Sequence, residues 1–381
     1  MRFLAGVSGV FILALVLVDS FNCLLLARRT EHRFRIAPIF YRLTWKPFSA
    51  VGRKIQSSRR RESFLGIYGP LSLVLLFGLW AIGLVLAFGL LQWAFHMQPE
   101  ALPDTFGNDL YLSAATLFTL SSGNPQNAAS KLVTVLEGGL GFTFLGLVVA
   151  YLPVLYQSFS NRELRISLLD VMAGSPPSAG ALLQCAPENP GKLEDQLEVW
   201  EQWSAQVLEN QMSFPMLAYF RSQHANQAWL TALAAMVDCS AVICICSKGD
   251  LQRQAKMTFA MGRHVLADLA AVFRLQNQMS HRPEDARLSE ADFAALQEVV
   301  RGKPELLDAD LCTPDRLRGC RRLYETESMR LSEYFLMALP AWIPNANARG
   351  NWRAELADAT EVPFGASDPF AEPSVNLRRP R

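Results

Sequence analysis

The chain carries almost no net charge, because its 36 Lys and Arg residues are matched by 35 Asp and Glu residues, which gives +1 at neutral pH. Such a balance gives no ground for predicting a nucleic-acid-binding protein, which needs a clustered basic surface. The balance hides an uneven distribution. Residues 97–130 contain neither Lys nor Arg, whereas residues 28–61 contain eleven basic side chains.

The usual signatures of catalysis and of metal binding are also missing. The sequence contains no phosphate-binding loop, no Gly-x-Ser-x-Gly element and no His-Glu-x-x-His element. Its seven Cys residues show no paired spacing, and Cys239, Cys244 and Cys246 do not have the spacing of metal ligands. We therefore expect buried, reduced thiols, and we predict a protein that is not an enzyme and uses no cofactor or metal.

Hydrophobic residues make up 50% of the chain, and many of them fall in three long runs at residues 3–27, 65–95 and 132–156. Each run is long enough to cross the roughly 30 Å hydrocarbon layer of a membrane as a helix. The first run is longer than the core of a signal peptide and has no cleavage site before Arg28, so we expect it to stay in the membrane. The sequence therefore predicts three transmembrane helices.

A fourth apolar run, at residues 225–246, carries Asp238 at its centre. A central carboxylate costs about 2.5–3.5 kcal/mol in a membrane-inserted helix. We therefore predict that this run is the buried central helix of a bundle outside the membrane. Helical patterns at residues 193–212, 251–278, 289–301 and 314–339 indicate the rest of that bundle.

The charges of the connecting segments predict the orientation. Basic loops stay in the cytoplasm, so residues 28–61 are expected inside and residues 97–130, which carry only acidic charge, are expected outside. This places the N-terminus outside and the C-terminal half in the cytoplasm, as in a multi-pass protein of the plasma membrane. The basic cluster is either a plain topology signal or a surface for anionic lipid head groups.

The segment between the second and third runs is short and only moderately apolar, which is typical of a loop that dips into the membrane and returns. It resembles the filter of the potassium-channel superfamily, which reads Thr-x-x-Thr-Val-Gly-Tyr-Gly-Asp. Five positions of that pattern have counterparts here. Thr116 and Thr119 correspond to its two threonines, and Leu120, Gly123 and Asn124 correspond to its Val, its second Gly and its Asp.

The resemblance implies a pore loop in which residues 111–118 form a half-helix, capped by Asn108 or Asp109, and residues 119–124 form the selectivity filter. The negative end of such a half-helix favours a cation, and the carbonyl groups of the filter replace part of its hydration shell. One loop supplies only a quarter of the ring, so the resemblance implies a homotetramer. The permeant ion would be a monovalent cation, either potassium or sodium.

Two positions depart from the family pattern, because Ser121 replaces the first filter glycine and Ser122 replaces the tyrosine. A side chain at the glycine position costs roughly 1 kcal/mol or more where the backbone is left-handed. Ser122 lacks the ring that braces the filter in the family, and Asn124 lacks the acidic charge at the mouth. These departures predict a wider, weakly selective filter. True potassium selectivity and a pore that does not conduct stay open as alternatives.

The third run contains residues suited to gating or to lining a pore. Gly139, Gly146 and Pro153 could act as hinges, although small residues also allow close packing of membrane helices. Glu137 is an ionisable residue within an apolar run, which makes it a functional candidate that faces either the back of the pore helix or the ion path. Asp19, in the first run, is expected to pair with a basic residue at the membrane interface.

These observations predict an all-α membrane protein with three transmembrane helices, one re-entrant pore loop and an α-helical cytosolic domain. The expected parts are an N-terminal transmembrane helix at 1–27, a basic cytosolic loop at 28–64, a pore module at 65–158, a cytosolic helical domain at 159–340 and an extended or disordered tail at 341–381. The expected function is a cation pore gated through the cytosolic domain. The alternative is a non-conducting membrane sensor or scaffold that keeps the fold of a pore module.

Overall fold

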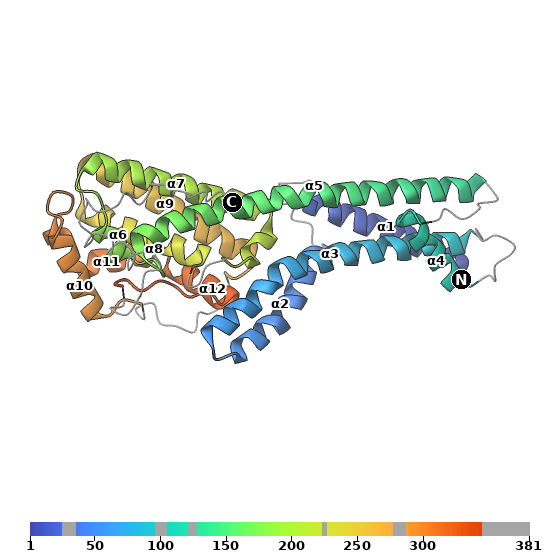
Figure 1. Ribbon diagram of the computed structural model, residues 1–381, viewed down its shortest axis with the longest axis horizontal. Helices are drawn as coiled ribbons and strands as arrows, with labels where there is room; N and C mark the ends of the chain where they lie inside the picture. The colour runs from blue at the N-terminus through green and yellow to red at the C-terminus, as the bar shows by residue number, and fades with distance from the viewer. Residues whose placement is uncertain (25–35, 96–104, 121–127, 223–226, 277–286, 345–381) are drawn as a thin grey trace, which may run out of the picture.

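The computed structural model describes residues 1–24, 36–95, 105–120, 128–222, 227–276 and 287–344, and all regular structure in these ranges is helical (Figure 1). The predicted all-α fold is thus confirmed for the described residues. The α-helices are α1 (Arg2–Leu24), α2 (Ile36–Lys54), α3 (Ser58–Ala94), α4 (Phe106–Leu117), α5 (Ala128–Ala173), α6 (Ala179–Gln184), α7 (Pro190–Ser213), α8 (Trp229–Cys246), α9 (Gly249–Val272), α10 (Glu290–Arg301), α11 (Pro314–Arg321) and α12 (Glu325–Phe335). Two short 3-10 helices, η1 (Pro215–Tyr219) and η2 (Ala309–Leu311), lie among them.

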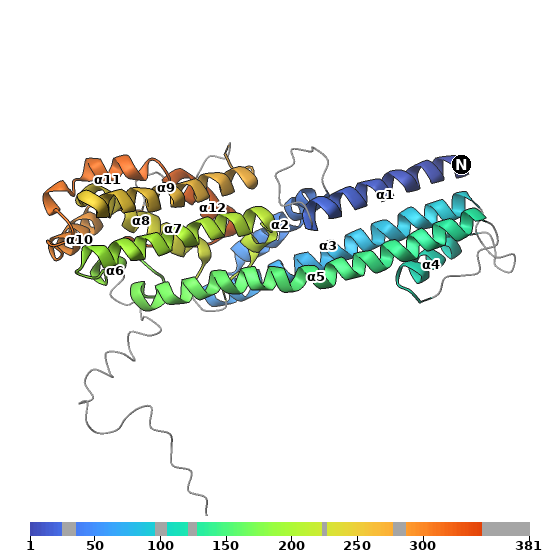
Figure 2. The ribbon, with the colours of Figure 1, turned by 90° about the horizontal axis from the view of Figure 1, so that it is seen from above.

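Four helices, α1, α3, α5 and α8, are long and apolar enough to cross a membrane, which indicates a membrane protein. The first three belong to an elongated unit, and α8 belongs to a bundle that lies end to end with it (Figure 1). Figure 2 shows α1 on one side of α3 and α5 on the other. α1 runs antiparallel to α3, because Gly6 lies against Ala94 whereas Val16 lies against Gly83. The two helices are in close contact, since a Cβ atom on Gly9 would lie 2.8 Å from the carbonyl oxygen of Ala87.

The segment predicted as a basic loop at 28–64 is only partly a loop, because it contains α2 and the first turns of α3. The buried residues of α2 recur at steps of three and four, as on one face of a helix; they are Ala37, Tyr41, Trp45, Ser49 and Gly52. This face packs against α3, where the hydroxyl groups of Thr44 and Tyr68 are 2.8 Å apart and the ring of Phe48 stacks on Phe64. The basic residues of this segment concealed the helix, whose buried face combines the large side chains of Tyr41 and Trp45 with small residues.

Asp19 of α1 is buried and binds the first turn of α2. Its carboxylate accepts hydrogen bonds from the backbone amides of Ile36, at 2.8 Å, and Ala37, at 3.1 Å, and from Nε1 of Trp80, at 2.9 Å. A carboxylate at the N-terminus of a helix satisfies free amide groups and complements the helix dipole. Among the described residues, these donors replace the basic partner that we expected for Asp19, and they join α1, α2 and α3.

α5 continues without a break from the elongated unit into the bundle. It has 46 residues, which span about 69 Å at about 1.5 Å per residue. The boundary predicted at residues 158–159 therefore falls inside a helix. Close to this predicted boundary, Arg162 is buried and donates to the carbonyl oxygens of Leu217, at 2.8 Å, and Phe220, at 3.0 Å.

α8 is the centre of the bundle, and every one of its side chains is buried within the protein, as the sequence predicts. Asp238 forms an ion pair with Arg287 and accepts a hydrogen bond from the hydroxyl of Tyr324. Removal from water raises the pKa of the Asp238 carboxyl to about 6, because the desolvation outweighs the attraction of Arg287. The carboxylate that argued against a fourth membrane span is thus accommodated by a buried ion pair.

The ends of the bundle helices follow their capping signals. Ser289 and Asp292 form the capping box that their spacing predicts, and the Thr313 hydroxyl caps α11. The single helix expected at residues 314–339 is in fact two, α11 and α12. The composition of residues 173–191, which are rich in Pro, Gly and Ser, predicts a loop, but the stretch contains the short buried helix α6. The predicted tail lies outside the described residues from residue 345 onward.

Candidate functional site

The short helix α4 lies against α3 and α5, the second and third apolar helices of the elongated unit. It has 12 residues, about 18 Å, which is less than the roughly 30 Å needed to cross a membrane. It begins five residues before the predicted half-helix at 111–118. Thr105 is its N-cap, so Asn108 and Asp109, which we expected as caps, lie within its first turns.

α4 runs along α3 from the end of that helix towards its middle. The ring of Phe106 lies 5.8 Å from that of Trp93, near the C-terminus of α3. Two turns later, the Ser113 hydroxyl lies 2.9 Å from the carbonyl oxygen of Val85. Trp93 and Val85 are about 12 Å apart along α3, at about 1.5 Å per residue. The C-terminal end of α4 therefore lies beside the interior of α3 and not beside its end.

Glu137 of α5 is completely buried and joins three helices. Its carboxylate accepts a hydrogen bond from Nε2 of Gln92 on α3, at 2.7 Å, and one from the hydroxyl of Ser113 on α4. We expected Glu137 to face either the back of the pore helix or the ion path, and its described contacts are with α3 and α4. Gln92 and Ser113 were missed in the sequence, although each is a polar residue in an otherwise apolar segment.

Gly141 lies one turn further along α5 and allows the end of α4 to come close. A Cβ atom at this position would lie 2.3 Å from the carbonyl oxygen of Leu117, far inside a normal contact. This position therefore requires glycine. The predicted residues Gly139 and Gly146 differ, because an added Cβ would meet nothing within 4 Å there among the described residues.

α4 ends in a left-handed turn at Thr119, which has φ of 58°. The amide of Leu120 donates to the carbonyl oxygen of Ala115, at 2.8 Å, which is the closing bond of a Schellman-type helix end. A β-branched residue rarely adopts this conformation, and the strain is of order 1–3 kcal/mol. We expected such strain at Ser121, but that residue and the filter candidates Ser122, Gly123 and Asn124 lie outside the described residues.

The first part of α5 has three different faces. One face is buried against α3, α4 and the bundle; it contains Glu137, Gly141, Tyr151 and Leu155. Between residues 139 and 153 a second face is exposed and consists of small or polar residues and proline, although large apolar residues precede it on the same side of the helix; it contains Gly139, Thr143, Gly146, Ala150 and Pro153. A third is exposed and consists of large apolar residues; it contains Phe142, Leu145, Val149, Leu152 and Tyr156. Such a division separates a surface suited to lipid from one suited to close approach of other chains.

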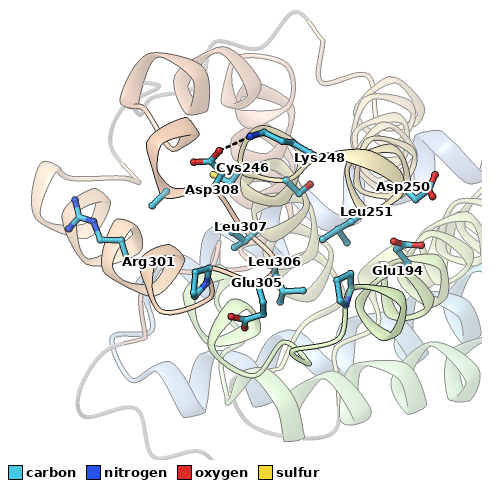
Figure 3. A pocket seen from close by; sticks show the side chains of 14 residues that line it. Glu194, Cys246, Lys248, Asp250, Leu251, Arg301, Glu305, Leu306, Leu307 and Asp308 are labelled. Carbon is cyan, nitrogen blue, oxygen red and sulfur yellow. Dashed lines mark hydrogen bonds and ion pairs between the residues drawn. The ribbon is translucent and has the colours of Figure 1, made fainter.

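A separate cavity of about 690 Å³ lies at the far end of the bundle, between the starts of α7 and α9 and the segment before η2 (Figure 3). Its rim carries charges of both signs, and Lys248 forms an ion pair with Asp308 at 2.8 Å. Cys246, Leu251, Leu306 and Leu307 also line it. It contains none of the residues that the sequence marked as functional.

Comparisons with known proteins do not identify the chain. No family model, no curated protein and no solved structure matches it. The potassium-channel resemblance therefore stays a prediction, and the case for a function depends on the residues and contacts described above.

Proposed function

We propose that this chain is one subunit of a homotetrameric pore for monovalent cations, potassium or sodium, with weak selectivity. The observation that carries the proposal is the placement of α4. Its carbonyl end is held part-way along α3 and α5 by Glu137 and by the contact at Gly141. A helix end in that position aims its negative dipole into the membrane, where it stabilises a cation.

The faces of α5 support four-fold assembly around this helix. Pro153 and the small residues at 139, 146 and 150 share an exposed face, whereas the large apolar side chains at 142, 145, 149, 152 and 156 lie on another. In the proposed tetramer the large residues contact lipid and the small ones face the other subunits and the ion path. Gly139, Gly146 and Pro153 are then the positions at which α5 bends or lines the pore.

One segment of the bundle, residues 215–222, contacts both proposed pore helices, α3 and α5. Arg162 on α5 binds its carbonyl oxygens, and Arg221 within it forms an ion pair with Glu62 on α3, at 3.2 Å. A movement of the bundle is therefore transmitted to both α3 and α5. We propose that this connection gates the pore from the cytoplasmic side, with the N-terminus outside the plasma membrane.

The bilayer is the main partner in this proposal, and anionic lipid is a second one. α2 exposes Arg42, Lys46 and Lys54, and the start of α3 exposes Arg59 and Arg60. Each basic side chain near an anionic leaflet contributes about 1 kcal/mol to membrane attachment. The basic segment 28–61 would therefore hold the cytoplasmic end of α3 at the head-group layer.

A non-conducting sensor or scaffold is the second candidate, and the sequence Ser121-Ser122 favours it. Without a filter glycine and a bracing tyrosine, the loop after α4 need not coordinate an ion. In that case α4 would serve only to pack α3 against α5, and the connection at residues 215–222 would pass a signal in the opposite direction.

Restoring the family residues should tighten the filter and so tests the proposal. The triple variant Ser121→Gly, Ser122→Tyr, Asn124→Asp relieves backbone strain, adds the bracing ring and restores charge at the mouth. We expect the reversal potential in potassium/sodium gradients to shift towards potassium, by about 59 mV for a tenfold gain in selectivity. A conducting variant with unchanged preference contradicts the filter assignment, and two non-conducting proteins favour the sensor.

A further inference from the structure

The second half of α5 has two apolar faces, and the described residues cover one of them. One face packs against the bundle, where its buried apolar residues are Leu155, Phe159, Ile166, Leu169 and Ala173. The nearly opposite face carries Leu164, Leu168 and Val171, which are 59%, 53% and 45% exposed. Three large apolar side chains at steps of four and three form a stripe, which we call the open stripe.

Lipid cannot cover the open stripe in the proposed orientation. α5 has 46 residues, and about 20 of them suffice to cross a membrane. Two basic residues, Arg162 and Arg165, occur at the start of the open stripe, as is typical of a helix that has left the membrane. The open stripe also lies on the part of α5 that packs against the bundle. It is therefore a water-exposed apolar surface, of the kind that marks a protein contact.

The spacing of the stripe identifies what covers it. Continued towards the membrane, the stripe passes through exposed residues at steps of three and four, namely Val154, Gln157 and Asn161. From 154 to 171 the steps alternate between three and four residues, which is the heptad pattern of a seam between supercoiled helices. Asn161 occupies a seam position where a polar residue fixes the register of identical helices.

The same face continues into the first part of α5. Gly139, Gly146 and Pro153 are seven residues apart and exposed, and they lie next to the seam positions. Figure 2 shows α5 along one edge of the molecule, where a neighbouring copy can approach it. Identical helices that descend side by side from a membrane are parallel and in register.

We propose that residues 154–171 of α5 pair with the same residues of other copies of this chain in a parallel helical bundle that begins at the inner end of the membrane span and continues below the membrane. The inference rests on the proposed function for the number of copies, four, and for the shared axis. It adds an assembly surface outside the membrane, formed by Leu164, Leu168 and Val171 around Asn161. This surface holds the ends of the proposed inner helices together.

Cysteine crosslinking of the full chain tests the seam. Leu164→Cys and Leu168→Cys are made separately and together, with Cys185→Ser removing the exposed native thiol. Tyr156→Cys is the matched control, because Tyr156 is 65% exposed on α5 but lies on the large apolar face. All three positions are on the surface, so the substitutions leave the fold intact. Oxygen with copper phenanthroline is the oxidant.

Seam cysteines should form disulfide-linked dimers about tenfold faster than the control, because pairing gives the thiols a high effective concentration. The double variant should give a ladder of up to four chains. Equal rates at Leu168→Cys and Tyr156→Cys would overturn the inference. Cation flux through the same preparations distinguishes the two proposals. A crosslinked ladder without cation flux overturns the pore and leaves the helix pairing intact. Cation flux together with equal crosslinking rates overturns the helix pairing and leaves the pore intact.

Discussion

Gly141→Ala should abolish cation flux and lower the thermal stability of the purified protein. The new methyl group would lie 2.3 Å from the carbonyl oxygen of Leu117, so either α4 or α5 has to move. The obstacle is backbone, which cannot rotate away as a side chain does. Overpacking of this kind costs about 1–3 kcal/mol, and the displacement falls at the end of α4 that carries the proposed ion site.

Gly138→Ala is the matched control for this substitution. Gly138 is in the same helix, three residues away, and an added Cβ meets nothing within 4 Å among the described residues. Its unfolding midpoint should equal or exceed that of the wild type, since Ala favours a helix more than Gly does. Equal midpoints and equal flux for the two variants would show that α4 does not pack at Gly141.

Glu137→Ala should have the second large effect. It removes the acceptor for Gln92 and one contact of Ser113, and it leaves a cavity between three helices. An unsatisfied buried amide costs about 1–3 kcal/mol, to which the lost packing adds. We expect a lower unfolding midpoint in detergent and a loss of flux, because α4 is released from α5.

Glu137→Gln separates the hydrogen bonds from the charge. The amide oxygen can still accept from Gln92, and the amide nitrogen can donate to the Ser113 hydroxyl, which in turn can donate to Val85. This variant should therefore keep most of the stability that Glu137→Ala loses. If both variants unfold at the same midpoint, Glu137 acts through its charge and not by tethering α4.

The long apolar helices could be predicted from the sequence because length and composition alone define them. The burial of α8 followed from Asp238 in the same way, since a single carboxylate distinguished a bundle helix from a membrane span. α2 could not be predicted so easily. Its first turn depends on Asp19, seventeen residues earlier, and its apolar face includes Gly52, which gives no hydropathy signal.

In the candidate site, too, single residues could be recognised from the sequence, whereas their contacts could not. Glu137 was recognised because an ionisable residue in an apolar run is costly, but its partners became evident only once α3 and α4 lay beside it. Gly141 could not be distinguished in sequence from Gly139 or Gly146, because only the position of Leu117 distinguishes them. The burial of Arg162, next to the predicted boundary at residues 158–159, could not be predicted either, because it depends on two backbone carbonyl groups of residues 217 and 220 that accept its hydrogen bonds.

Cation flux into liposomes that contain the purified full-length protein tests the central proposal most directly. Potassium and sodium influx should both exceed that of protein-free liposomes, with a modest preference for potassium, and Gly141→Ala should remove the flux while Gly138→Ala keeps it. The contrary result would be a folded and assembled protein that passes neither ion and whose two glycine variants behave as the wild type does. That result would contradict the proposal of a pore.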